Sequence, residues 1–93
     1  MRVDIFRGRP LTPDLESNKT ARLKWALEIA KKDFKPISNG EFDYDLRIYK
    51  FGAIIEKLRK EGWIIETIPT DQKNVFHYKL IAKPGEKLKL FDA

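Results

Sequence analysis

Cysteine is absent from this chain, and several other signals that identify common classes of protein are absent or scarce. Without cysteine, disulfide frameworks, cysteine-ligated zinc fingers and cysteine nucleophiles are excluded. The single histidine, His77, could ligate a metal only if several carboxylates converged on it from other parts of the chain. We therefore expect neither a metal site nor a cofactor.

The sequence also lacks the patterns of catalysis. Residues 7–10 contain only one glycine, so they do not form a glycine-rich phosphate-binding loop. No nucleophile stands beside a base in a recognisable motif. Asp43 and Asp45 are closely spaced carboxylates, but on a short acidic helix they are typical of solvated charge. We predict that the protein is not an enzyme.

Long apolar segments are lacking as well. No run approaches the roughly 18 apolar residues that cross a bilayer, and the charges within residues 1–7 are unlike the apolar core of a signal peptide. We expect a cytoplasmic protein with no membrane partner. Its 93 residues are enough for one domain with a modest core.

What the sequence does have is an unevenly distributed positive charge. The net charge of +5 is nearly all carried by residues 47–60, which hold five basic residues opposed by Glu56 alone. A concentrated basic surface is typical of phosphate binding, because neutralising phosphates releases condensed counterions. The alternative is a solvated helix face whose lysines serve solubility.

Apolar periodicity predicts the first helix over residues 18–32, with Ser17 as its N-terminal cap. Pro36 enforces a break after this helix. Ahead of this helix, residues 1–16 begin with a brief alternation of polar and apolar residues, which Gly8 and two prolines interrupt. We expect a short strand or arm there, followed by an extended lead-in.

A second and a third helix follow in the sequence. Ser38 and Glu41 stand at capping-box spacing and predict a short supporting helix that ends near Leu46. The third helix is predicted over residues 48–61, with Gly62 as its stop. One side of this third helix is apolar and the opposite side is mainly basic. The opposite side comprises Tyr49, Lys50, Ala53, Glu56, Lys57 and Lys60.

Residues 63–81 change from helical to extended periodicity. β-Branched and aromatic residues at 63–68 and 75–81 flank a polar segment, which predicts a β-hairpin. Trp63 is expected to anchor this hairpin to the core. We divide the chain into an N-terminal arm or short strand (1–16), one folded domain (17–82) and a C-terminal tail (83–93).

Three helices followed by a hairpin, with the basic face on the third helix, is the order of a winged helix-turn-helix domain, an α+β fold. Residues 17–81 resemble the small helix-turn-helix domains of many phage and prophage proteins. The matching positions are Leu58, Arg59, Gly62, Ile65, Tyr78 and Leu80. The chain departs from them at Ile54, where an arginine is common, and in a longer link between the first two helices. The resemblance implies DNA binding by a transcriptional or mobile-element regulator.

We predict that double-stranded DNA is bound through the third helix and the hairpin. Arg47 and Lys50 stand at the start of the helix, where side chains reach base edges or flanking phosphates. Gly52 is small enough to let the helix backbone enter a groove or, alternatively, to let it pack closely on the first helix. The predicted contacts are Arg47, Tyr49, Lys50, Ala53, Lys57 and Lys60 from the helix, with Lys73 and Asn74 from the hairpin tip.

Two other charges of the third helix are expected to have structural partners. Arg59 borders the apolar stripe, which favours an ion pair with an acidic residue of the second helix. Glu56 is unfavourable beside phosphate and is expected to pair with Lys60, four residues further along.

A protein-interaction module built on the same scaffold is the alternative function. The apolar ends of the chain, at residues 3–6 and 88–91, could pair with a partner chain as edge strands. Many winged helices bind DNA as homodimers, because two half-sites multiply specificity. Double-stranded DNA is the expected partner. No pattern in this sequence marks a dimer interface, so the sequence neither indicates nor excludes a homodimer.

Overall fold

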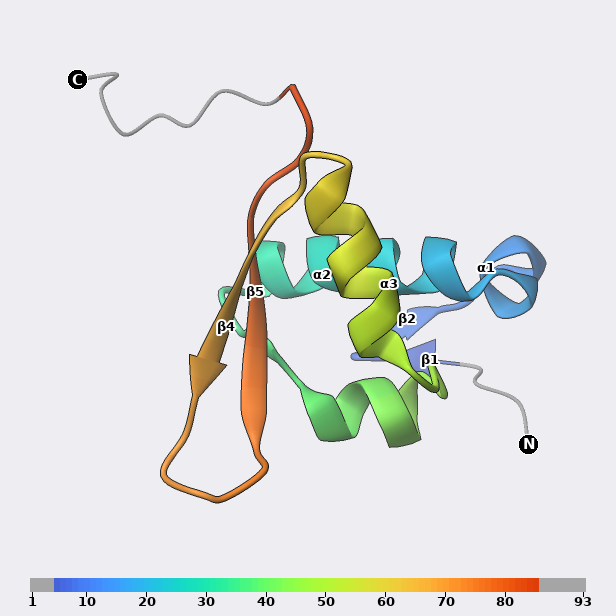
Figure 1. The fold of residues 1–93 in the computed structure, drawn as a ribbon. Helices are drawn as coiled ribbons and strands as arrows, with labels where there is room; N and C mark the ends of the chain where they lie inside the picture. Colours follow the sequence, from blue (N-terminus) through green and yellow to red (C-terminus); the bar gives the residue numbers. More distant parts are fainter. Residues whose placement is uncertain (1–4, 86–93) are drawn as a thin grey trace.

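Helices and antiparallel strands are both present in the computed structural model, which describes residues 5–85 (Figure 1). The α+β class expected from the sequence is therefore confirmed. In chain order the elements are β1 (Ile5–Phe6), β2 (Arg9–Pro10), α1 (Pro13–Ser17), α2 (Lys19–Asp33), β3 (Ile37–Ser38), η1 (Glu41–Asp45), α3 (Phe51–Lys60), β4 (Ile64–Pro69) and β5 (Phe76–Ala82).

Helix α2 confirms the first predicted helix but begins with a different cap. The side chain of Asn18 accepts a hydrogen bond from the Ala21 N–H (3.0 Å), so Asn18 is the N-cap. Ser17 instead closes the preceding helix, where its hydroxyl donates to the Asp14 carbonyl (3.2 Å). The helix ends at Phe34, whose left-handed backbone (φ 55°) reverses the chain ahead of Pro36.

The segment before α2 is folded rather than extended. Strands β1 and β2 form a tight hairpin in which Phe6 pairs with Arg9, and the two residues between them, Arg7 and Gly8, have φ values of 51° and 78°. Positive φ at both positions suits the right-handed twist of a short hairpin. Helix α1 then begins at the proline after Thr12, whose hydroxyl caps it. The expectation of an extended lead-in is wrong, because threonine followed by proline is a helix start.

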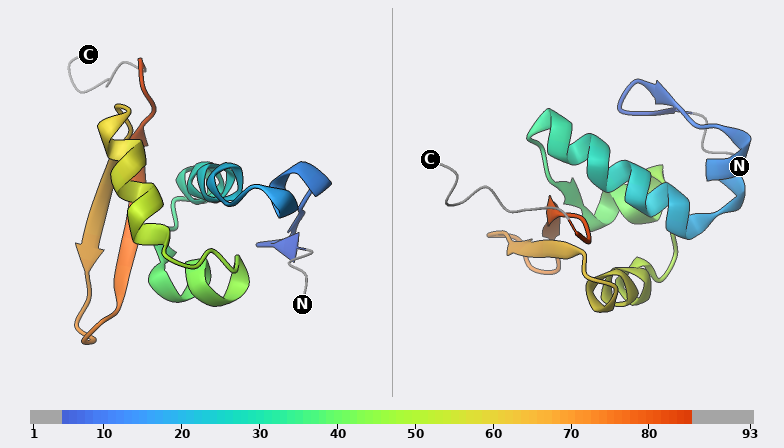
Figure 2. Two further views of the ribbon diagram at one scale, coloured as in Figure 1. Left: turned by 45° about the vertical axis from the view of Figure 1, so that its right-hand side comes forward. Right: turned by 90° about the horizontal axis from the view of Figure 1, so that it is seen from above.

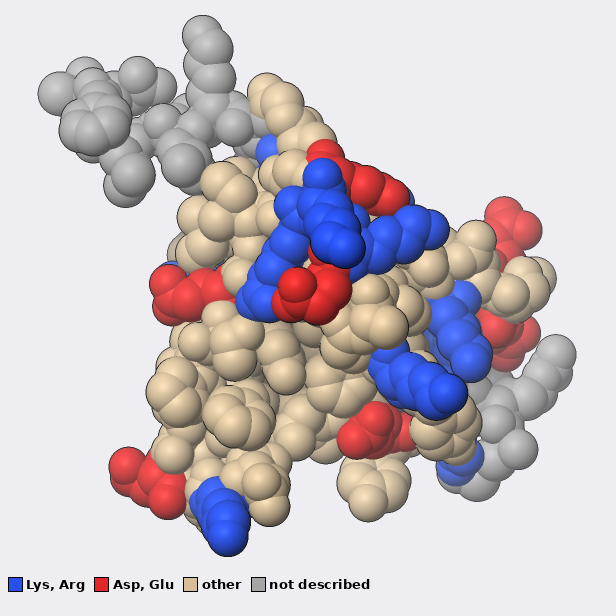
Figure 3. Space-filling view, in the orientation of Figure 1, with Lys and Arg blue, Asp and Glu red and all other residues tan. Residues whose placement is uncertain are grey.

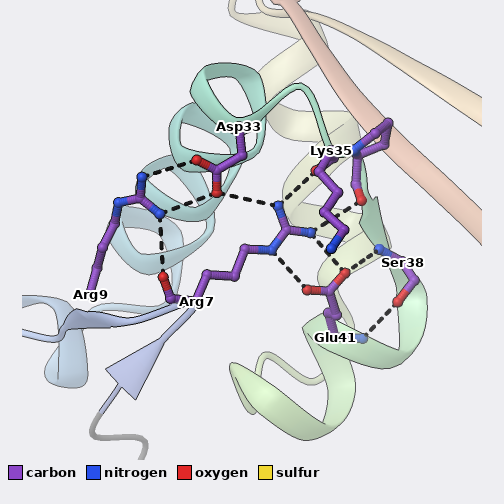
Figure 4. Close-up of polar contacts among 7 residues, drawn as sticks. Arg7, Arg9, Asp33, Lys35, Ser38 and Glu41 are labelled. Atoms are coloured by element: carbon purple, nitrogen blue, oxygen red, sulfur yellow. Dashed lines mark hydrogen bonds and ion pairs between the residues drawn. The ribbon is translucent and has the colours of Figure 1, made fainter.

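Two arginines fasten this N-terminal hairpin to the rest of the protein (Figure 4). The Arg7 guanidinium donates to both carboxylate oxygens of Glu41 (3.1 and 3.0 Å) and to the Lys35 carbonyl (2.7 Å). Arg9 donates to both carboxylate oxygens of Asp33 (3.2 and 3.0 Å). Phe6, in the same hairpin, is buried in the hydrophobic core. The hairpin is thus part of the folded body.

We expect the Asp33 ion pair to make the N-terminal hairpin acid-sensitive. The hydrogen bond from Arg9 lowers the pKa of Asp33 below its ordinary value of 3.8. A lowered folded-state pKa stabilises the folded protein above the unfolded value, and this contribution is lost as pH falls through the folded pKa. The protection of the amides of residues 5–9 against exchange, relative to the intrinsic rate at each pH, is expected to fall below pH 3.8. Asp33→Asn should show fast exchange at neutral pH, whereas Asp45→Asn, at an exposed site, should not.

The short helix η1 begins with the predicted capping box. Ser38 Oγ accepts from the Glu41 N–H (3.1 Å), and a Glu41 carboxylate oxygen accepts from the Ser38 N–H (3.2 Å). The helix is wound as a π-helix, and the Leu46 N–H donates to the Glu41 carbonyl (2.9 Å). Phe42 and Leu46 are both fully buried, as their spacing predicts.

The predicted hairpin of residues 63–81 is confirmed as β4 and β5, which pair antiparallel. A third strand, β3, pairs with β5 through Ile37 and Tyr78, giving the sheet order β3-β5-β4. Strand β3 was not predicted, because two residues are too short to show alternation. Trp63 packs against the core at the start of β4, and the side chain of Lys24 lies over its ring (5.5 Å).

The core lies where α2, η1 and α3 meet the sheet (Figure 2). Its aromatic centre is Phe42, which stacks on Phe51 (4.9 Å between ring centroids) and contacts Tyr78 (5.6 Å). Among residues 5–85, no helix combines the length and the apolar character needed to cross a bilayer. The same residues contain no cluster of histidine and carboxylate side chains arranged to hold a metal.

Candidate nucleic-acid interface

Helix α3 begins at Phe51, three residues later than the sequence predicts. Arg47 and Lys50 have left-handed backbones (φ 51° and 59°), so residues 47–50 form a turn. Ile48 secures this turn, because its side chain is fully buried and its N–H donates to the Phe42 carbonyl (2.8 Å). Arg47, Tyr49 and Lys50 are therefore presented by a fixed turn ahead of the helix rather than by its first turn.

The outer side of α3 is the surface that the sequence predicts. Ala53, Lys57 and Lys60 are exposed on α3, and Tyr49 and Lys50 are exposed just ahead of it. Within residues 5–85, the side chains of Arg47, Lys50, Lys57 and Lys60 make no hydrogen bond or ion pair. We call these four residues the basic surface.

Small residues occupy the first turn of α3. A Cβ added to Gly52 would meet no atom within 4 Å, so Gly52 does not serve close packing on α2. The next residue, Ala53, is also exposed and small. At these two positions no large side chain stands between the helix backbone and an approaching ligand.

Arg59 is the one basic residue among residues 47–60 whose side chain forms hydrogen bonds within the described part of the fold. Its guanidinium donates to the Ile65 carbonyl (2.8 and 3.2 Å), to Thr67 Oγ1 (2.9 Å) and to Glu56 Oε1 (2.7 Å). The sequence predicts other partners: an acidic residue of the second helix for Arg59, and Lys60 for Glu56. Both assignments are wrong, because β4 follows α3 directly and brings the Ile65 carbonyl and the Thr67 hydroxyl within reach of Arg59, which also binds Glu56 one helical turn away.

Lys73 and Asn74 lie at the tip of the β4–β5 hairpin, as expected, and both are exposed. The tip is held by Asn39, whose side chain donates to the Asn74 carbonyl (2.9 Å) and accepts from the Phe76 N–H (3.3 Å). In Figure 1 the tip projects past the N-terminal end of α3. The hairpin tip is thus a fixed feature that stands apart from the helix.

The eight predicted contact residues fall into two groups. Figure 3 shows basic side chains gathered over the C-terminal half of α3, with acidic side chains among them, and further basic side chains lower on the same face. The surface between α3 and the hairpin tip is largely uncharged. The structure therefore brings six of the predicted residues together along α3 and its leading turn, and it places Lys73 and Asn74 at a distance.

Arg22 is the residue that sequence reasoning missed. It is buried, and its guanidinium donates to the carbonyls of Leu46 (2.8 Å) and Arg47 (3.2 Å) and to two carbonyls at the end of α1. Burial lowers the pKa of Arg22, while the nearby Glu16 carboxylate acts in the opposite direction. Arg22 thereby fixes the turn that presents the basic surface. The sequence signal for a buried arginine was its position next to Leu23, which belongs to the apolar stripe of the helix.

Comparisons with protein-family models, curated proteins and solved structures find no match to this chain.

Proposed function

We propose that this protein binds double-stranded DNA through the basic surface of α3 and its leading turn. The observation that carries this proposal is the set of four basic side chains, Arg47, Lys50, Lys57 and Lys60, that make no polar contact within residues 5–85. Cations that do not serve the fold are available to phosphate groups, and their binding would be driven largely by counterion release.

We also propose that the fold is a winged helix-turn-helix, with α3 as recognition helix and the β4–β5 hairpin as wing. The order of α2, β3, η1, α3, β4 and β5 supports this proposal, as does the packing of the hairpin beside α3 (Figure 2). The hairpin β1–β2 and helix α1 are additions ahead of this unit. The resemblance to phage and prophage domains, and a role as transcriptional or mobile-element regulator, stay predictions.

The proposed contacts differ in kind along the surface. Lys57 and Lys60 are point charges on a flexible stem, suited to phosphate. Gly52 and Ala53 would let the helix backbone approach a groove closely. Arg47 is the only described arginine whose guanidinium makes no hydrogen bond, so it is the best candidate to read a guanine. Recognition based on one arginine would depend more on DNA shape than on base sequence.

The test is a titration of fluorescein-labelled random-sequence duplex DNA, followed by anisotropy at several salt concentrations. We expect tight binding at low salt and a steep loss of affinity as salt rises. The double variant Lys50→Ala with Lys57→Ala should bind more weakly, and the slope of log affinity against log salt should fall by about 0.9 for each lysine that contacts a phosphate.

The matched control is Lys32→Ala with Lys79→Ala, which removes the same charge from exposed positions on α2 and β5. Its salt slope should equal that of the wild-type protein. No binding at low salt, or an equal loss of affinity in both double variants, would show that the basic surface does not bind duplex DNA.

A further inference from the structure

A hollow of about 340 Å³ lies on another part of the protein, between the C-terminal end of α2 with its following loop and residues 79–81 of β5. In Figure 2 (right), the end of α2 and α3 lie on opposite sides of β5, so the hollow is separate from the basic surface. Its volume is roughly ten times the ~30 Å³ share of one water molecule in the liquid, which gives room for a large side chain. We call it the Phe34 hollow.

Phe34, at the rim of this hollow, is doubly unfavourable for the isolated fold. Its side chain is 92% exposed, the largest exposed fraction among the large apolar residues described. Its backbone is left-handed (φ 55°), a conformation that glycine or asparagine adopts at lower cost. Phenylalanine at position 34 therefore adds no buried apolar surface to the fold and does not favour the backbone conformation found there. An aromatic side chain at this position is useful if another molecule covers it.

The edge of β5 beside the hollow has no partner strand among the described residues. Strand β3 pairs with β5 only at His77 and Tyr78, whereas β4 pairs with it as far as Ala82. Pro36 precedes β3 and has no N–H, so the chain cannot extend this ladder along β5. An extended segment could therefore add to β5 at residues 79–82 and continue the line of β3.

The charges around the hollow are of one sign. Among the described residues that line it, the charged ones are Lys31, Lys35 and Lys79, and none is a carboxylate. The nearest acid in sequence, Asp33, is held by Arg9. We propose that the Phe34 hollow binds an extended acidic segment of a partner protein, which adds as a strand to β5 and places a large apolar side chain against Phe34.

Two occupants from this chain itself fit the charge less well. The C-terminal tail, residues 86–93, is neutral overall, because Lys87 and Lys89 are balanced by Glu86 and Asp92; two of its four charges have the same sign as the rim, and it has no net negative charge to complement the lysines. A second copy paired through the same edge would bring one lysine-rimmed edge against another, and like charges across paired strands are destabilising. An acidic partner segment avoids both conflicts.

The experiment is a selection from a phage-displayed library of random linear peptides on the whole chain. Enriched sequences are expected to combine acidic residues with leucine or phenylalanine. Synthetic versions of them should bind in solution and shift amide NMR signals only around residues 30–36 and 79–82. Enrichment without acidic residues, or no enrichment, would contradict the proposal.

Single substitutions then test whether the selected peptides bind in the Phe34 hollow. Phe34→Asn removes the aromatic ring and keeps a residue that tolerates the left-handed backbone, and Lys79→Glu reverses a rim charge. Each is expected to weaken peptide binding about tenfold or more. Tyr44→Asn and Lys19→Glu make the same exchanges at exposed positions elsewhere and should leave peptide binding unchanged. Equal binding to all four variants would place the peptide outside the hollow.

Two further results would assign the hollow to the chain itself. If peptides bind only after residues 86–93 are removed, the tail is the occupant; the truncated chain keeps all the buried core residues that the structure describes, which lie between Phe6 and Ala82. If the whole chain dimerises and Phe34→Asn makes it monomeric, a second copy is the occupant. Either result overturns the assignment to an acidic partner segment.

Discussion

Replacing Phe42 with alanine is expected to lower the free energy of unfolding by about 3–5 kcal/mol, the cost typical of removing a buried aromatic side chain. Phe42 is fully buried and contacts the rings of Phe51 on α3 and Tyr78 on β5, which also contact each other. A domain of this size has a total stability of roughly 5–15 kcal/mol. The variant should therefore be marginally folded at room temperature, because the Phe42 ring joins η1 to both α3 and the sheet.

Urea unfolding followed by the fluorescence of Trp25 and Trp63 measures this effect. The control is Tyr44→Ala, because Tyr44 is an aromatic residue of the same short helix but is 79% exposed. Its effect should stay within about 0.5 kcal/mol. If Phe42→Ala unfolds at the same urea concentration as Tyr44→Ala, the described core around η1 is wrong.

Replacing Arg22 with methionine is expected to cost about 3–5 kcal/mol. Methionine keeps much of the aliphatic bulk but leaves four main-chain carbonyls without the donor they have in the native protein. Lysine should not restore the stability, because a single ammonium group cannot reach four carbonyls that a planar guanidinium spans. The control Lys19→Met removes an exposed charge from the start of the same helix.

The Arg22 variant has a second readout at a distance from the substitution. Arg22 binds the carbonyls of Leu46 and Arg47, so its removal should loosen the turn ahead of α3. Amide exchange at residues 46–50 is expected to accelerate more than exchange in the β4–β5 hairpin. Uniform acceleration would mean that Arg22 stabilises the protein as a whole without fixing this turn.

The parts of the fold that sequence predicted are those with a repeated local pattern. Helix α2 has a long apolar stripe, the β4–β5 hairpin has two strands rich in β-branched and aromatic residues, and Ser38 and Glu41 have the spacing of a capping box. Each of these patterns is local in the sequence and is typical of one kind of structure. These elements therefore needed no information about distant contacts.

The parts that sequence did not predict depend on single backbone conformations or distant partners. Lys50 is left-handed without being glycine, and nothing in its neighbours marks the later start of α3. The turn at Arg7 and Gly8 is stabilised by Glu41, more than thirty residues away. Strand β3 exists because β5 is there to pair with it. Local propensity cannot report such tertiary effects.

The exposed side chains of the candidate site were predicted more fully than the contacts that hold them in place. The exposed positions of the basic surface follow from helical periodicity, since a face opposite the apolar stripe must meet solvent. The role of Arg22 does not follow, because its acceptors are main-chain carbonyls that any sequence supplies. DNA binding itself stays a prediction.

Two sets of basic residues can be separated in this protein: one holds elements of the fold together, and the other, the basic surface, does not. Arg7, Arg22 and Arg59 bind main-chain carbonyls and join elements of the fold, whereas the lysines of the basic surface contact no described polar group. Acetylation of those lysines, or their replacement during evolution, could weaken attraction to a polyanion without unfolding the domain. Affinity and stability can therefore change independently, which gives a small protein freedom to acquire a new partner on an unchanged scaffold.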